Sequence, residues 1–250
     1  MKKEWPKLAT PPITEAVIEI RFSPNEHVTL DHLKTFAEAT KSRYPKRAPL
    51  YVMSGQFGVS PEGDAKARST AQAVGLRLTN VEGNRTCMAR IDYISVSFLP
   101  PYTPWPALAE AAHETYDKYR KIVPQEQVIR VGMRYVNRLN LPLIEGQDIL
   151  ELITTEPRFP KGIPELLSGF ETTVYLPLET NSGAIVRQRL EPPSSPDQKG
   201  VPFVLDIDAF FQTEKGIDEP RIWKILETLR EHKNAIFFGT VTDKGLEPYK

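Results

Sequence analysis

The sequence predicts an α+β fold in which a curved, predominantly antiparallel sheet packs one face against long amphipathic helices. Many segments alternate apolar and polar residues with a period of two, and few helical segments separate them. Each long helical segment carries one apolar stripe that needs a sheet face to cover it. The length of 250 residues suits one large domain or two small ones.

The first half of the chain, 1–125, is predicted to fold as strand, helix, four strands and helix. The strands are expected at 14–22, 50–59, 73–80, 86–91 and 93–99, with a polar loop at 60–70 and a tight turn or bulge at Asp92. The helices are expected at 29–44, where Thr29 can act as the N-cap with His32 at the third position, and at 103–122, with Pro104 in the first turn.

The second half, 126–250, is predicted as strand, short helix, three strands and helix. The strands are expected at 127–141, 170–178, 184–191 and 203–211, and the helices at 148–154 and from Asp218 to about 239–242. A proline- and serine-rich loop at 192–202 is expected to be mobile. The two halves repeat one order of elements without a residue-level repeat, so they could be an internal duplication that shares one continuous sheet as a single globular unit. Saddle-shaped nucleic-acid binders share this order, which is an analogy of fold alone.

Composition narrows the class of protein. Lysine plus arginine equals aspartate plus glutamate, 32 each, so the net charge is zero. A zero balance disfavours a protein that binds by neutralising a phosphate backbone, although it allows a local basic patch. The single cysteine, Cys87, excludes an internal disulfide and a cysteine-based zinc cluster and reads as a small core residue. With no signal-like or membrane-spanning apolar run, we expect a cytoplasmic protein that does not enter a membrane.

The segment 127–141 is the most informative candidate site. Its alternation places Arg130, Arg134 and Arg138 on one face of a long strand, spread over roughly 26 Å. They cannot grip one phosphate together, but they could follow an extended ligand or meet a partner. They could equally form cross-strand ion pairs with Glu15 and Glu19 of the first strand. The predicted binding residues are Arg130, Arg134, Arg138, Glu15, Glu19 and Arg21.

Catalytic alternatives rest on weaker patterns. Glu15, Glu19 and Arg21 are similar to the opening strand of tunnel-shaped triphosphate hydrolases, but Val17 stands where a metal-binding glutamate is needed. Asp206 and Asp208 share a strand face and could hold magnesium. His113 and Asp117 lie one helical turn apart without a second histidine. We therefore expect no catalytic residue, no metal and no cofactor.

Two motifs resemble a known family. The opening PPITEAVIEIRF at 11–22 and the strand RVGMRYVNR at 130–138 are similar to a sporadically distributed bacterial and archaeal family without an assigned biochemical function. The resemblance covers nearly the whole chain. It implies an accessory role, because such patchy families often accompany defence or toxin–antitoxin genes.

These observations together predict a non-catalytic binding or interaction protein, with a protein encoded nearby as the partner and a homo-oligomer as a further option. A metal-dependent phosphoester or triphosphate-processing enzyme that uses the polar sheet face, and a nucleic-acid-binding module, stay open as alternatives.

Overall fold

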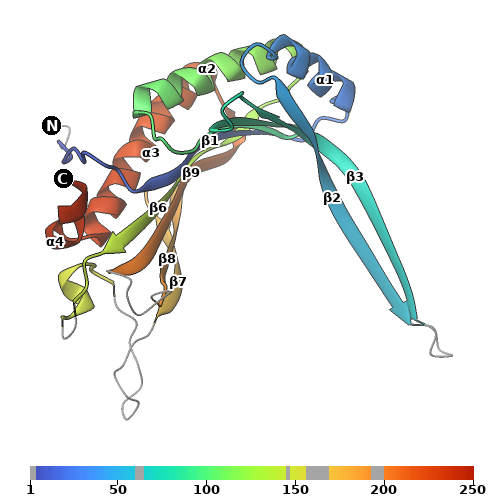
Figure 1. Ribbon diagram of the computed structural model, residues 1–250. Helices are drawn as coiled ribbons and strands as arrows, with labels where there is room; N and C mark the ends of the chain where they lie inside the picture. Colours follow the sequence, from blue (N-terminus) through green and yellow to red (C-terminus); the bar gives the residue numbers. More distant parts are fainter. Residues whose placement is uncertain (1–3, 60–64, 145–146, 156–168, 193–199) are drawn as a thin grey trace.

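The computed structural model describes residues 4–59, 65–144, 147–155, 169–192 and 200–250. Within them the chain forms one sheet that bends into an arch, with the long helices lying along its outer side (Figure 1). The described ends of the chain lie side by side, and the backbone N–H of Thr10 donates to the carbonyl of Tyr249 at 3.3 Å.

The sheet has nine strands in the order β2-β3-β4-β5-β1-β6-β9-β8-β7, and every neighbouring pair is antiparallel. This confirms the predicted α+β class with a predominantly antiparallel sheet. The strands are β1 (Ile13–Phe22), β2 (Lys46–Val59), β3 (Ala65–Thr79), β4 (Arg85–Arg90), β5 (Tyr93–Phe98), β6 (Val128–Leu141), β7 (Phe170–Pro177), β8 (Ser182–Leu190) and β9 (Val201–Ile217).

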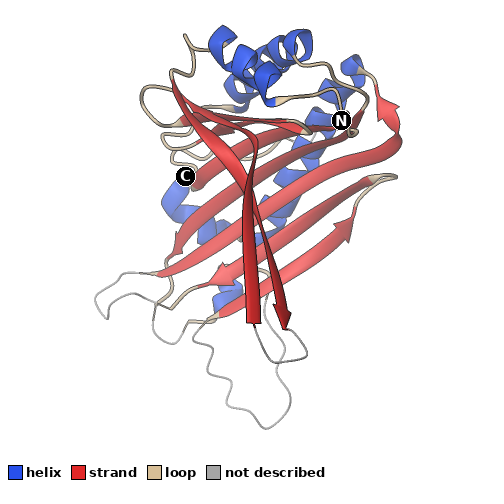
Figure 2. Ribbon diagram, turned by 90° about the vertical axis from the view of Figure 1, so that its right-hand side faces the viewer, coloured by secondary structure: helices blue, strands red, loops and turns tan. Residues whose placement is uncertain are grey.

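The helices cover one face of the sheet (Figures 1 and 2). Helix α2 packs on β5 and β1, α3 packs on β9 and β6, and α1 packs on β3 and on α2. We call this side the covered face and the opposite side the open face. The helical elements are α1 (Leu30–Ala39), α2 (Trp105–Ile122), η1 (Ile149–Glu151), α3 (Glu219–Thr240), α4 (Asp243–Leu246) and η2 (Glu247–Tyr249).

The core lies between the sheet and the helices, as the alternating pattern predicts. In β1, Ala16, Ile18 and Ile20 are at most 2% exposed, while the residues between them face the other way. In β6, Met133 and Tyr135 are each 1% exposed. Because Ile18 lies opposite Val96 of β5 and Met133 of β6, the centre of the sheet is dry on its covered side.

Several predicted boundaries are wrong, among them the end of the last strand, which is Ile217 and not residue 211, and the start of the second, which is Lys46 and not residue 50. Helix α1 ends at Ala39, not at residue 44, because Thr40 leaves the helical conformation and its hydroxyl donates to the carbonyl of Phe36. The predicted loop at 60–70 is too long, since residues 65–70 belong to β3. The predicted helix at 148–154 is a 3-10 turn at Ile149–Glu151. Residues 193–199 of the predicted mobile loop lie outside the described part of the chain, and β9 has already begun at Val201.

The strands β2 and β3 form a long hairpin that projects away from the rest of the molecule (Figures 1 and 2). Strand β4 pairs with β3 only from Gly75 to Thr79, so beyond that point β2 and β3 pair with each other alone. We call the part Tyr51–Val59 with Ala65–Ala73 the arm. A two-stranded ribbon has solvent on both faces, which is why its strands lack the alternation that marks a half-buried strand.

Among the described residues, no helix is both long enough and apolar enough to cross a membrane.

The packing predicts different costs for the two faces of the sheet. Ile18→Ala removes a side chain that is 1% exposed and should lower the free energy of unfolding by about 2–5 kcal/mol. Ile185→Ala makes the same chemical change on the half-buried open face of β8 and should cost less than about 1.5 kcal/mol. Urea denaturation of both variants measures the difference. Equal losses would contradict the assignment of the core to the covered face.

Candidate interaction surface

The open face carries a network of arginines and carboxylates on β1, β6, β8 and β9. The antiparallel registers place Glu19 opposite Gly132, Arg134 opposite Asp208, and Asp206 between Val136 and Arg187. All six predicted binding residues lie on this face. Its charged members are Glu15, Glu19, Arg21, Arg130, Arg134, Arg138, Arg187, Arg189, Asp206 and Asp208, with Glu191 just beyond β8.

Arg130 lies at the centre of the first cluster. Its guanidinium donates to Glu19 at 2.5 Å and to Asp208 at 3.4 Å, and it covers the ring of Phe210 at 4.9 Å from the centroid. A Cβ atom on Gly132 would come within 2.8 Å of its Nη1, so glycine at that position leaves room for the guanidinium to fold over the strand. The side chain of Arg130 is only 15% exposed.

Arg134 and Asp206 form a second, two-pronged ion pair. The Nε and Nη2 of Arg134 each donate to one carboxylate oxygen of Asp206 at 2.8 Å, and Arg187 from β8 donates to the same carboxylate at 3.2 Å. The hydrogen bonds to Asp206 raise the pKa of Arg134 above its usual value. Asp206 is 5% exposed, so it is a buried anchor that two arginines share.

Arg138 belongs to a third cluster, near the end of β6 and the end of β8, which we call the rim. It donates to Glu191 at 2.7 Å, and Arg189 reaches the other oxygen of the same carboxylate at 2.7 Å. Both arginine side chains are 50% exposed. Arg134 is similarly open at 47%.

The predicted residues of β1 do not all join one site. Glu19 accepts from Arg21 at 2.6 Å as well as from Arg130, and Arg21 lies over the ring of Tyr93. The hydrogen bond to Glu19 raises the pKa of Arg21. Glu15 accepts instead from the hydroxyl of Ser97 on β5 at 2.6 Å. Of the cross-strand pairs expected between the three arginines and Glu15 or Glu19, the structure forms only Arg130–Glu19.

The structure therefore combines two interpretations that the sequence left open. Each of Arg130, Arg134 and Arg138 has a carboxylate partner within the chain, while Arg134 and Arg138 still present half of their side chains to solvent. The paired Asp206 and Asp208 are partners of these arginines. Sequence reasoning missed Arg187, Arg189 and Glu191, although the alternation V-R-Q-R in β8 carries the signal.

The surroundings of Asp208 disfavour its ionised form and raise its pKa. Burial raises the pKa of Asp208, the nearby Arg130 lowers it, and the negative charge of Glu19 raises it again, with a net upward shift. Its contacts with Arg130 are long, at 3.4 and 3.5 Å. Asp208 is thus a carboxylate whose ionised form the fold stabilises poorly.

Other chemistry lies away from this face. Cys87 is fully buried on the covered side, and burial raises the pKa of its thiol, which disfavours the nucleophilic thiolate. Among the described residues, no group of three or more His, Cys, Asp or Glu side chains could hold a metal ion. His113 and Asp117 contact each other on α2, with 3.4 Å between Nδ1 and the carboxylate.

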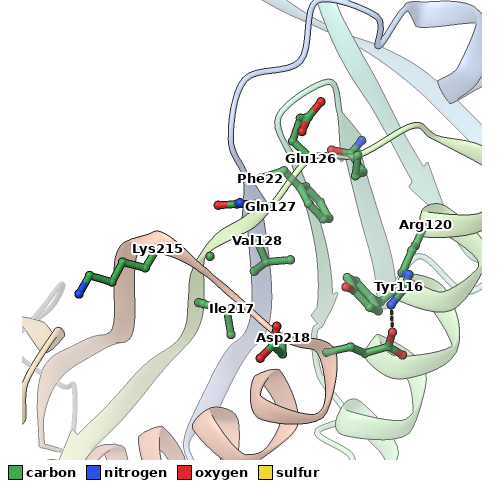
Figure 3. Close-up of a pocket in the computed structure, with 12 residues that line it drawn as sticks. Phe22, Tyr116, Arg120, Glu126, Gln127, Val128, Lys215, Ile217 and Asp218 are labelled. Carbon is green, nitrogen blue, oxygen red and sulfur yellow. Dashed lines mark ion pairs between the residues drawn. The ribbon is translucent and has the colours of Figure 1, made fainter.

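A polar cavity of about 420 Å³ lies between the end of β1, α2 and the start of α3 (Figure 3). An ion pair between Arg120 of α2 and Glu219 of α3 borders it, and Tyr116 and Val128 line its inner side. Gly216, with a φ of 77°, also lines this cavity and lies where the register of the β6–β9 pairing shifts near the end of β9. None of the predicted binding residues lines it.

Comparison of the chain with models of known protein families and with curated proteins finds no match.

Replacing Asp206 and replacing Asp208 should change the free energy of unfolding by very different amounts. Asp206→Asn leaves Arg134 and Arg187 without their shared buried carboxylate and should lower the free energy of unfolding by about 3 kcal/mol or more at pH 7. Asp208→Asn leaves the short Arg130–Glu19 pair in place and should change it by less than about 1 kcal/mol. Urea denaturation of both variants and the parent measures these changes.

The stability of the parent and that of Asp208→Asn should depend differently on pH. Because folding raises the pKa of Asp208 above its usual 3.8, the stability that its protonated form contributes is present below 3.8 and is lost as pH rises through the higher folded value. The parent should therefore lose stability relative to Asp208→Asn as the pH rises from 4 to 7. A constant difference across this range would contradict the shift.

Proposed function

We propose that the chain is a non-catalytic binding protein whose open face receives another protein, encoded near its own gene. One observation carries the proposal: the network on this face is rich in exposed arginine and yet nearly balanced in charge, because its six arginines stand with five carboxylates and each of the six pairs with one of them. The family resemblance adds the expectation that the partner belongs to a defence or toxin–antitoxin-like system, in which this chain is an accessory component.

The charge balance favours a protein over a nucleic acid. A phosphate backbone gains affinity by replacing its counterions with free cationic side chains. Here a phosphate would have to compete with Asp206 for Arg134 and with Glu191 for Arg138. The zero net charge of the chain adds no long-range attraction for a polyanion. A surface of mixed charge suits a partner surface of mixed charge.

The same ion pairs prepare the arginines for binding. Arg134 is held by two hydrogen bonds of 2.8 Å, so it loses little side-chain freedom when a partner covers it. Arginine is enriched among residues that dominate protein interfaces, because its planar group accepts contacts on its faces and donates at its edges. Arg138 and Arg189, joined through Glu191, extend this surface along the rim.

The arm supplies a second contact region on the other leg of the arch. Tyr51 and Met53 lie two residues apart on one strand and are 59% and 75% exposed, and Val52 between them is 45% exposed. A two-stranded ribbon without further packing is only marginally stable in water. Tyr51 and Met53 share one face of the ribbon, and we infer that a partner seated under the arch also covers these two side chains.

We further propose that the arch arose by duplication of one unit. From the central β1–β6 pair, the strand order runs outward as β5-β4-β3 on one side and β9-β8-β7 on the other. Helix α2 follows β5 directly, and α3 follows β9 in the same way. Under this correspondence, α1 and β2 are additions of the first half, and β2 forms one of the two strands of the arm.

The exposed arginines give a direct test. Co-expression with the products of the adjacent genes should yield a defined complex, and Arg134→Ala/Arg138→Ala should weaken it at least about tenfold in calorimetric titration of the purified pair. The matched control is Arg43→Ala/Arg120→Ala, which removes two part-exposed, ion-paired arginines from the helical side and should bind like the parent. Circular dichroism and melting temperature establish that both variants fold.

Three outcomes would overturn the proposal. The first is a folded Arg134→Ala/Arg138→Ala variant that binds every partner unchanged. The second is binding of duplex or single-stranded nucleic acid with a steep salt dependence, and the third is a clear rise in melting temperature with nucleoside triphosphate and magnesium or manganese. The second outcome would point to a nucleic-acid-binding module, and the third to a phosphoester- or triphosphate-processing enzyme.

The arm has its own test on the same complex. Tyr51→Ser/Met53→Ser should leave the melting temperature within about 2 °C of the parent, because both side chains are already exposed, while it weakens partner binding about fivefold or more. Val81→Ser, at the exposed turn before β4, is the control, since Val81 is 65% exposed and outside the arm. Unchanged binding by the arm variant would remove the arm from the interface.

A further inference from the structure

A cavity of about 830 Å³ lies on the covered face, on the other side of the sheet from the proposed partner surface. It is lined by α3, the start of α2, the centre of the sheet and the N-terminal segment 4–13, and it is open to solvent on one side. Its size is within the range of small-molecule sites. Aromatic and proline side chains dominate its lining, among them Trp5, Pro11, Pro12, Tyr102, Trp105 and Phe238.

The N-terminal segment is fixed in place as one wall of this cavity. The ring of Trp5 stacks on Phe238 with centroids 5.4 Å apart, and its Nε1 donates to Glu231 at 2.8 Å. Further along, the carbonyl of Pro12 accepts from the backbone N–H of Arg138 at 2.8 Å. The cavity is therefore a built feature of the fold with a wall that is anchored at both ends.

Lys233 is the unusual member of the lining. Its amine lies 4.3 Å from the ring centroid of Tyr135, a residue that is 1% exposed, so the charged end of the side chain is deep although its stem reaches the surface. In the part of the chain that the structure describes, Lys233 forms no ion pair. Two acids of the same helix form hydrogen bonds with other residues: Glu231 accepts from Trp5, and Glu227 accepts from Trp105 and Arg230.

The surroundings of Lys233 disfavour its charge. Burial is the larger cause and the positive charge of Arg230 the second, and together they lower the pKa of the amine to about 7 despite the opposing effect of Glu231. A lysine that served packing alone would be replaced with a gain in stability by methionine, which has a similar length and no charge to desolvate. Other polar groups meet at the same place: Asn234 is 8% exposed, and the hydroxyls of Tyr102 and Tyr135 are 3.5 Å apart.

We propose that this cavity binds a small amphipathic carboxylate, whose acid group pairs with Lys233 while its apolar body packs among the aromatic rings. The ligand supplies the ion-pair partner that Lys233 does not have among the described residues. A flat or straight apolar body suits walls made of tryptophan, tyrosine, phenylalanine and proline.

The binding test uses phenylacetate and octanoate as probes and phenylacetamide as the neutral counterpart. At millimolar concentration, at least one acid should raise the melting temperature of the full chain and give ligand-detected magnetic resonance signals, while the amide should bind at least about tenfold more weakly. Lys233→Met should reduce the affinity for the acid at least about tenfold. Lys224→Met, on an exposed position of the same helix outside the cavity, should leave it unchanged.

A pH series adds a readout that a structural role would not produce. The affinity for the acid should fall about tenfold or more between pH 6 and pH 9, as the free Lys233 amine loses its proton, and the Lys233→Met variant should show no such fall. Burial raises the pKa of both Tyr102 and Tyr135 above 10, so the tyrosines stay protonated in this range. The other charged or titratable groups that line the cavity are Arg230 and Glu231 on α3, Tyr102 before α2, Tyr135 on β6, and Glu4 and Lys7 in the N-terminal segment; of these, Arg230 and Glu231 act on the charge of the amine.

The ligand-free variant is informative as well. Because folding lowers the pKa of Lys233, Lys233→Met should melt at a higher temperature than the parent at pH 7, and this advantage should shrink as pH rises toward 10.5. The proposal is overturned if neither acid binds at 10 mM, if the amide binds as well as the acid, or if Lys233→Met binds the acid as tightly as the parent does.

Discussion

The antiparallel pairing of β1 with β6 is the interaction on which the rest of the structure depends. Among the described residues it is the only strand pairing between the first and second halves of the chain. It sets the register that places Ile18 beside Met133 on the dry side and Glu19 beside the guanidinium of Arg130 on the wet side. A slip of one residue would exchange these faces and bury the arginines, so core packing and surface charge enforce the same register.

The carboxylates of the charged network offset the repulsion between arginines that lie on neighbouring strands of the open face. Arginines on neighbouring strands would repel one another and carry a desolvation cost if they stood alone near the apolar parts of the sheet. Asp206 and Glu191 each pair with two arginines, and Glu19 pairs with Arg21 and Arg130. Three carboxylates therefore bind all six arginines of the network. The result is a rigid surface with directional donors and little net field, which discriminates by geometry more than by charge.

The sequence predicts the class of fold well, because periodicity reports burial directly. The alternation in 127–141 assigns each face of β6 correctly, and His32 takes the capping-box position, where its Nδ1 accepts from the backbone of Thr29 at 3.2 Å. Partners are harder to predict, since pairing of Arg134 with Asp206 depends on a contact 72 residues away that no local pattern encodes. The arm is predicted only in part: the strand expected at 50–59 covers Tyr51–Val59, but 65–70 is assigned to a loop, because a segment with both faces in solvent shows no alternation. The cavity at Lys233 depends on four separate segments and has no sequence signature.

The arm also affects how the molecule moves through water. Nine residues of extended chain beyond the support of β4 reach about 30 Å, a length comparable with the width of a small domain. A body with such a projection has more friction than a sphere of equal mass, so it diffuses slowly and leaves a gel-filtration column early. A single chain is therefore expected to elute with an apparent mass above its 28.3 kDa, and light scattering gives the true mass.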